Sequence, residues 1–144
     1  MEQAQGGLGE TRRGGNMIHT ALLVVGDVVA FIVFAWIGRR SHAESVGLDS
    51  LVETVETAAP FIAGWFLVSP LLGAFRAEMA PLAMARRTAL AWLLALPVAL
   101  VLRALALGRA SPAIFAVITG VTNLVLLTGW RTAFAWVLRR RVVE

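Results

Sequence analysis

Four stretches of the chain are apolar for about twenty residues each, and short polar segments rich in arginine separate them. The stretches run from residue 17 to 38, 51 to 75, 88 to 108 and 112 to 138. A helix of about twenty apolar residues crosses the hydrocarbon of a bilayer, because each residue adds about 1.5 Å. The sequence therefore predicts an all-α polytopic membrane protein, a bundle of four transmembrane helices.

The composition explains why lipid has to be the solvent of these helices. Apolar residues make up 58% of the 144-residue chain and charged residues only 15%, whereas soluble domains are about half apolar and a quarter charged. Residues 1–16 are polar and rich in glycine, so we expect a flexible cytoplasmic tail there and a single membrane domain over residues 17–144. All basic residues are arginine, as is typical of bacterial chains encoded by GC-rich genes.

Prolines and arginines place the predicted helix boundaries. Pro60 and Pro70 would both lie inside the second helix, where neighbouring helices can satisfy the carbonyl that a proline leaves without a donor. A short turn would occupy residues 76–87. Ser111 followed by Pro112 is typical of a helix start, with the serine as cap and the proline in the first turn.

The distribution of arginine predicts the orientation in the membrane. Eight arginines fall on the side of the tail, the second connection and the C-terminus, against three on the other side, where acidic residues also gather. The positive-inside rule then places both termini in the cytoplasm and the chain in the inner (cytoplasmic) membrane. Trp92, Trp130 and Trp136 are expected near the inner interface, and Trp36 near the outer one.

Asp27 is the residue that is most costly to place in such a bundle. It lies about ten residues into the first apolar stretch, at a depth where a carboxylate costs several kcal/mol unless it is paired or protonated. Counting along the helices brings Arg103 within reach and puts Asn123 at a similar depth. These three side chains could bind a ligand or relay a proton, or they could form a salt bridge that only fixes the helices in register. Glu56 competes with Asp27 as the partner of Arg103.

A second group of polar residues follows the first predicted helix directly. Arg39, Arg40, Ser41 and His42 offer two guanidiniums, a hydroxyl and an imidazole, which together could bind a phosphate or a carboxylate. The alternative is that the arginines only complement the helix dipole and the lipid headgroups.

The sequence predicts no cofactor and no metal site. His19 and His42 are 23 residues apart, which is about 34 Å along a helix, so they cannot both ligate one haem. The chain has no cysteine, no His-Glu-x-x-His motif and no glycine-rich phosphate loop. We expect no nucleic-acid partner, because the arginines lie at the edges of apolar segments, and no catalytic motif predicts an enzyme.

Several short motifs occur in an order that resembles a known family. They are Gly26-Asp27, Gly38-Arg39-Arg40-Ser41-His42, Pro60-Phe61 with Gly64-Trp65, Arg103, and Gly129-Trp130-Arg131. Together they resemble a small prokaryotic family of four-helix integral membrane proteins that is described only as a domain of unknown function. The resemblance implies the same architecture but no activity or cofactor. It marks these residues for testing: Asp27, Arg39, Ser41, His42, Trp65, Arg103 and Arg131. From the position of Arg131 alone, near the end of the fourth apolar stretch, we expect it to be an anchor at the inner interface.

These features favour a small binding or transport-like protein with a polar core, in contact with membrane lipid, and they leave open a homo-oligomer or a larger membrane complex as its assembly. A structural or accessory subunit of a larger membrane complex is the first alternative, in which small residues such as Gly26, Ala59 and Gly120 would pack against partner helices. A membrane enzyme that acts on a lipid phosphate at Arg39 and His42 is the second.

Overall fold

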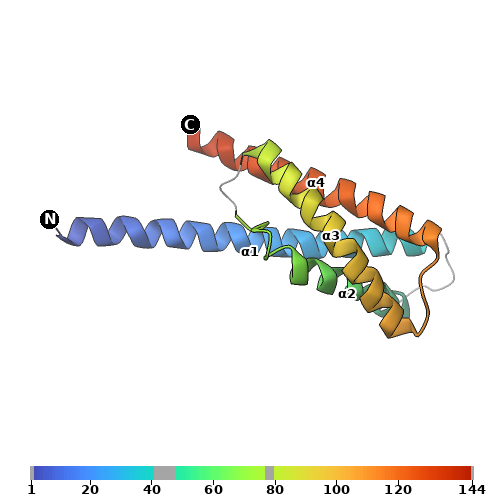
Figure 1. Ribbon diagram of the computed structural model, residues 1–144. Helices are drawn as coiled ribbons and strands as arrows, with labels where there is room; N and C mark the ends of the chain where they lie inside the picture. Colours follow the sequence, from blue (N-terminus) through green and yellow to red (C-terminus); the bar gives the residue numbers. More distant parts are fainter. Residues whose placement is uncertain (1, 41–47, 77–79, 144) are drawn as a thin grey trace.

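The computed structural model describes residues 2–40, 48–76 and 80–143, and every regular element within them is an α-helix. Four helices follow one another: α1 (Glu2–Arg40), α2 (Leu48–Val68), α3 (Pro81–Leu107) and α4 (Ala113–Val143). The two termini and the end of α2 that leads into α3 lie toward one end of the molecule, and the α3–α4 connection lies at the other (Figure 1). The predicted all-α bundle of four helices is confirmed.

Each helix contains a segment long and apolar enough to cross a bilayer. These segments are Gly15–Arg40, Asp49–Val68, Pro81–Leu107 and Ala113–Arg141. The backbone of α1 is already helical from Glu2, so the helix continues into the segment expected to form a tail, but its apolar part begins close to the predicted residue 17. The chain is a multi-pass membrane protein.

The second helix is shorter than predicted. It ends at Val68, so Pro60 lies inside it and Pro70 does not. A proline disfavours helical backbone at the residue before it and has no N–H to continue the hydrogen-bond ladder. The chain turns instead over residues 69–75, and Ser69 and Ala74 in this turn are fully buried. The turn therefore folds back into the bundle.

The third helix is longer than predicted, because it begins at Pro81 and not near residue 88. Proline suits the first helical position, since its fixed φ matches the helix and its missing N–H would have no partner there. Arg86 and Arg87 consequently belong to α3 and not to a turn. The helix ends at Leu107 and is capped by Gly108, whose φ of 66° is the left-handed conformation that glycine adopts without strain.

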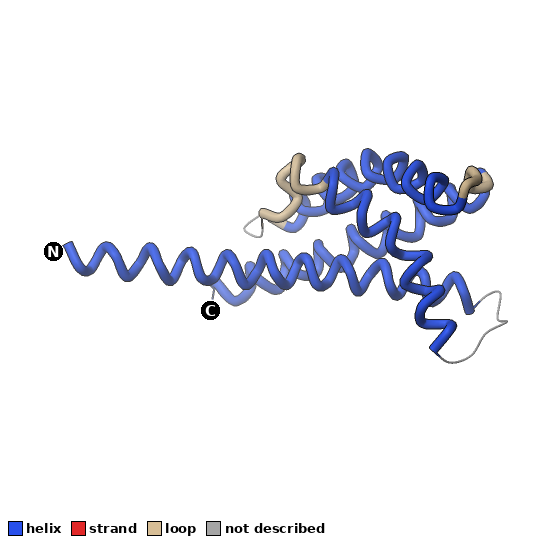
Figure 2. The backbone as a smooth tube through the Cα atoms, turned by 90° about the horizontal axis from the view of Figure 1, so that it is seen from below, coloured by secondary structure: helices blue, strands red, loops and turns tan. Residues whose placement is uncertain are grey.

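The four helices form a ring in which each packs against its neighbours in the chain and α1 also packs against α4. The α2–α3 and α3–α4 contacts are the most extensive, and the α1–α4 contact is the least. The backbone tube in Figure 2 shows the described part of the α2–α3 connection and the α3–α4 connection at opposite ends of this arrangement. Gly64 permits the close α2–α3 approach, since a Cβ there would lie only 2.8 Å from the backbone of Ala99.

Aromatic side chains fill the centre of the ring, and aliphatic side chains cover its outside. Phe31, Trp65 and Trp92 come from three different helices, and their ring centroids lie 5.6 to 6.4 Å apart. Trp92 is therefore fully buried in the core and does not lie at the interface as its position in the sequence suggested. The outward faces carry exposed large apolar residues along all four helices, as lipid contact requires.

Candidate functional site: a buried ion pair

Asp27 lies in the middle of the bundle and is fully buried. Its two carboxylate oxygens accept four hydrogen bonds from three side chains. Oδ1 accepts from Nε of Arg131 at 2.8 Å and from Nε1 of Trp130 at 3.0 Å. Oδ2 accepts from Nη2 of Arg131 at 2.5 Å and from Nε1 of Trp65 at 2.8 Å. The pairing of carboxylate and guanidinium is thus bidentate, the strongest geometry available to these groups.

Arg131 of α4 is the counter-charge, and it too has no exposed surface. Its third hydrogen bond runs from Nη1 to the backbone oxygen of Ala74 at 2.5 Å, which lies in the turn after α2. The guanidinium also lies 5.0 Å from the ring centre of Trp65 and 4.8 Å from that of Phe75. One side chain therefore joins α1, α4 and the α2–α3 turn.

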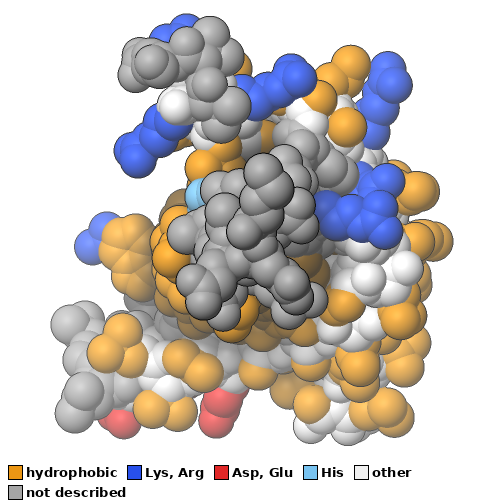
Figure 3. Space-filling view, turned by 90° about the vertical axis from the view of Figure 1, so that its left-hand side faces the viewer, with side chains coloured by type: hydrophobic (Ala, Val, Ile, Leu, Met, Phe, Trp, Pro, Cys, Tyr) orange, Lys and Arg blue, Asp and Glu red, His pale blue; other side chains and the backbone are white. Residues whose placement is uncertain are grey.

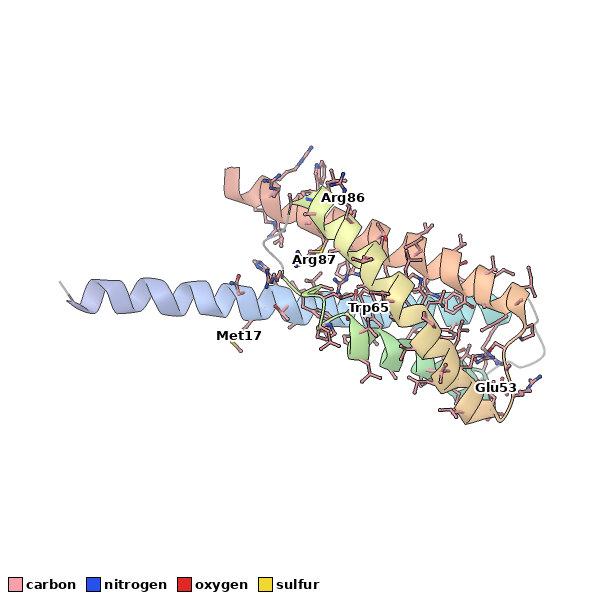
Figure 4. All side chains as sticks on the ribbon, in the orientation of Figure 1. Met17, Glu53, Trp65, Arg86 and Arg87 are labelled. Atoms are coloured by element: carbon pink, nitrogen blue, oxygen red, sulfur yellow. The ribbon has the colours of Figure 1, made fainter. Side chains whose placement is uncertain are left out.

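Two tryptophans complete the enclosure of the Asp27 carboxylate. Trp65 comes from α2 and lies at the centre of the bundle (Figure 4). Trp130 immediately precedes Arg131 on α4 and reaches the carboxylate across Gly26 of α1. A Cβ on Gly26 would lie 2.1 Å from the Trp130 ring, so only glycine leaves room for this indole. The Gly-Asp and Gly-Trp-Arg motifs therefore form one structure.

The Asp27–Arg131 pair is both costly and well satisfied. Removing two charges from water is repaid only when the pairing geometry is good and the remaining donors and acceptors have partners. The carboxylate has four hydrogen bonds and the guanidinium three, so this condition is met. The pair closes the α1–α4 contact, which is otherwise the least extensive in the ring.

Arg103 does not contact Asp27, one of the two partners that the sequence leaves open for it. Its Nε donates to Oγ of Ser111 at 3.2 Å, and its guanidinium lies 4.5 Å from the ring centre of Phe115. α3 begins at Pro81, seven residues earlier than predicted, so Arg103 lies 22 residues after the start of the helix and four before its end at Leu107. Arg103 and Glu56 do not form an ion pair with each other; the ion pairs among the described residues are Arg39–Glu53 and Asp27–Arg131.

Asn123 is also separate from Asp27. It lies two helical turns before Arg131 on the same buried face of α4, and its Nδ2 donates to the backbone oxygen of Thr119 at 3.0 Å. Arg131 was expected to be an interfacial anchor and is instead fully buried. Among the residues that the resemblance marked for testing, Trp65 and Arg131 are the ones that the structure brings to Asp27.

The group after the first helix is only partly described. Arg39 forms an ion pair with Glu53 of α2, and the guanidinium of Arg40 lies 4.4 Å from the ring centre of Trp36. Ser41 and His42 lie outside the described residues. A role for these four side chains in ligand binding stays a prediction.

Comparison with known proteins identifies the chain at the level of a family. Residues 24–134 match the model of a family described as "Protein of unknown function (DUF3054)". The matched range includes Asp27, Trp65, Trp130 and Arg131. No curated protein and no solved structure matches the chain.

Proposed function

We propose that this chain, which belongs to the DUF3054 family, is a small transport-like membrane protein in which the Asp27–Arg131 pair opens and closes the contact between α1 and α4. One observation carries the proposal: a bidentate ion pair without any exposed surface lies inside four lipid-facing helices. Ionisable residues inside membrane spans are expensive and are commonly tied to the passage of ions or solutes.

The chemistry of the pair indicates the class of ligand. Opening the pair would leave the guanidinium of Arg131 buried without its carboxylate, so that it needs another anion. A solute with a carboxylate or phosphate group can replace Asp27 there in the same bidentate geometry. We therefore propose a small anionic solute as the ligand.

The packing of the ring supports the α1–α4 contact as the place of opening. α3 is held by extensive contacts on both sides, whereas the contact between α1 and α4 is the least extensive in the ring. Domain and helix movements use contacts with few buried apolar residues. Separating α1 from α4 would expose the ion pair and leave the α2–α3–α4 unit together.

The orientation in this proposal has both termini in the cytoplasm and the chain in the inner membrane. The arginines of the α2–α3 connection, of the start of α3 and of the end of α4 support it, because they outnumber those at the opposite end. The exposed Gly38, at the end of α1 before the first connection, would then face outward.

Single cysteines test the proposal, since the chain contains none of its own. Ala135 and Ala58 are both fully buried; Ala135 lies one turn beyond Arg131, toward the C-terminus, and Ala58 lies toward the opposite end. A membrane-impermeant maleimide should label Ala135→Cys from the cytoplasmic side and Ala58→Cys from the other side. Labelling of both should be slow in the native background and at least several-fold faster when Asp27→Asn breaks the pair.

The control is Gly38→Cys, which should react from the outer side at the same rate with or without Asp27→Asn. A static bundle gives the opposite result to the proposal: Gly38→Cys is labelled, while both buried positions stay protected in folded protein whatever residue stands at 27. That outcome would leave the ion pair a structural element.

A second function, as an accessory subunit, is favoured by one feature of α2. Glu56 lies on its outward face among Val52, Val55 and Ala59, and within the described residues it has no ion-pair partner. A carboxylate beside a small residue on a lipid-facing helix suits a partner helix that supplies a donor. In this case the protein should co-purify stoichiometrically with a partner, and Glu56→Gln should weaken that complex. Recovery of the protein alone, unaffected by Glu56→Gln, would exclude this role.

A further inference from the structure

Two arginines at the cytoplasmic end of the proposed orientation converge on Gly73, in the turn that follows α2. A Cβ on Gly73 would lie 3.1 Å from Nη1 of Arg87 and 3.3 Å from Nε of Arg76. Both guanidiniums therefore border the same small space, which a larger side chain would fill. The φ of Gly73 is 64°, so glycine is also the residue that adopts this backbone conformation without strain.

Within the described residues, the two guanidiniums have little to neutralise them. Arg87 makes one long hydrogen bond, 3.5 Å from Nη1 to the backbone oxygen of Gly73, and neither arginine forms an ion pair in the part of the chain that the structure describes. That part leaves out residues 77–79. Two cations that border the same small space repel each other, and an anion between them converts that repulsion into attraction.

The surroundings favour an anion as well. Arg87 extends from α3 toward the turn, whereas Arg86 beside it extends away (Figure 4). The end-on view in Figure 3 shows arginine side chains gathered on this face of the molecule. The first turn of α3 has no side-chain cap, so its free N–H groups add partial positive charge at this end of the helix.

We propose that Arg76 and Arg87 form a binding site for a phosphate group, either that of an anionic lipid headgroup or that of a free phosphate. Guanidinium pairs suit phosphate because each offers parallel N–H donors to two of its oxygens. The position suits a headgroup, since it lies where a spanning helix begins. The site involves neither Asp27 nor solute passage, so it does not depend on the function proposed above.

The site also lies beside the residue that holds Arg131. The backbone oxygens of Gly73, Ala74 and Phe75 accept, in turn, from Arg87 of α3, Arg131 of α4 and Thr20 of α1, at 3.5, 2.5 and 3.5 Å. A phosphate bound at Gly73 would restrain this turn and should raise the thermal stability of the whole bundle.

The test uses the full chain in nanodiscs of neutral phosphatidylcholine, with the melting temperature as readout. Two probes are titrated separately: inorganic phosphate in solution, and phosphatidylglycerol mixed into the disc. We expect a saturable rise in melting temperature with at least one probe. A rise with phosphatidylglycerol alone identifies a lipid headgroup, and a rise with inorganic phosphate identifies a free phosphate. No saturable response to either probe would overturn the proposal.

Matched variants separate a site from general attraction between charges. Arg76→Gln and Arg87→Gln should each weaken binding at least tenfold, and Arg86→Gln, which removes the same charge one residue away, at most twofold. Equal losses of affinity in all three variants would overturn the site.

Gly73→Ala should abolish binding because its Cβ fills the space between the two guanidiniums. Gly108→Ala controls for backbone strain, since its φ is 66° but nothing lies within 4 Å of the added Cβ, and it should bind normally.

Discussion

Removing one partner of the Asp27–Arg131 pair should destabilise the bundle far more than removing one partner of Arg39–Glu53. The side chains of the first pair have no exposed surface, whereas those of the second are 29% and 46% exposed. Leaving a single buried charge without its partner costs about 3–5 kcal/mol. An exposed pair contributes about 0–1 kcal/mol. Arg131→Met and Asp27→Asn should therefore each cost about 3–5 kcal/mol, and Arg39→Met less than about 1 kcal/mol.

The double variant Asp27→Asn/Arg131→Met tests whether the two charges act as one coupled unit. With both charges gone, the remaining cost is that of one poorly satisfied amide, about 1–3 kcal/mol, so the double variant should be no less stable than the worse single one. Equilibrium unfolding in mixed micelles with a rising fraction of SDS measures these differences. Tryptophan emission reports the unfolding, because Trp65 and Trp130 donate directly to the Asp27 carboxylate and lose this environment when the bundle unfolds. Purely additive costs, or a single cost below about 1 kcal/mol, would refute the view that the pair is a coupled, desolvated unit.

Two further predictions concern the enclosure of the pair. Gly26→Ala should displace the Trp130 ring, whose nearest atom would lie 2.1 Å from the new Cβ, and cost about 1–3 kcal/mol in the same unfolding assay. Its control is Gly129→Ala on α4, which meets nothing within 4 Å and should be neutral or stabilising by up to about 1 kcal/mol, since alanine is the better helix former. Trp65→Phe removes one donor to Asp27 and should cost about 1–3 kcal/mol, with a matching loss of the blue-shifted part of the tryptophan emission; unchanged stability would mean that this hydrogen bond contributes nothing.

The number and approximate position of the helices were predictable because lipid imposes a length and a composition on any helix that crosses it. Asp27 was predictable for the same reason, since a lone carboxylate in an apolar stretch stands out by its cost. Neither inference needs any knowledge of tertiary contacts. Both follow from the solvent.

The pairing of Asp27 with Arg131 was not predicted, because the depths of the candidate partners in the membrane were counted from misplaced helix ends. The predicted third helix starts near residue 88, whereas α3 begins at Pro81. Counting from residue 88 therefore places Arg103 too close to the membrane centre. A usable signal was present in the positions of the two charges. Asp27 lies 12 residues after Gly15, and Arg131 lies 10 residues before Arg141. Two helices that run in opposite directions bring such positions to nearly the same depth.

The role of the α2–α3 turn could not be predicted from hydropathy, yet the ion pair depends on it. Because Pro70 ends α2 early, residues 69–75 fold back into the bundle, and the Ala74 oxygen reaches Arg131. Non-helical backbone at membrane depth is tolerated only where protein covers it, and Ser69 and Ala74 are indeed fully buried. An apolar turn of this kind has the composition of a helix, so a hydropathy profile extends α2 through it. Its carbonyls nevertheless hold α1, α3 and α4 together, and the short α2 is a condition for satisfying Arg131.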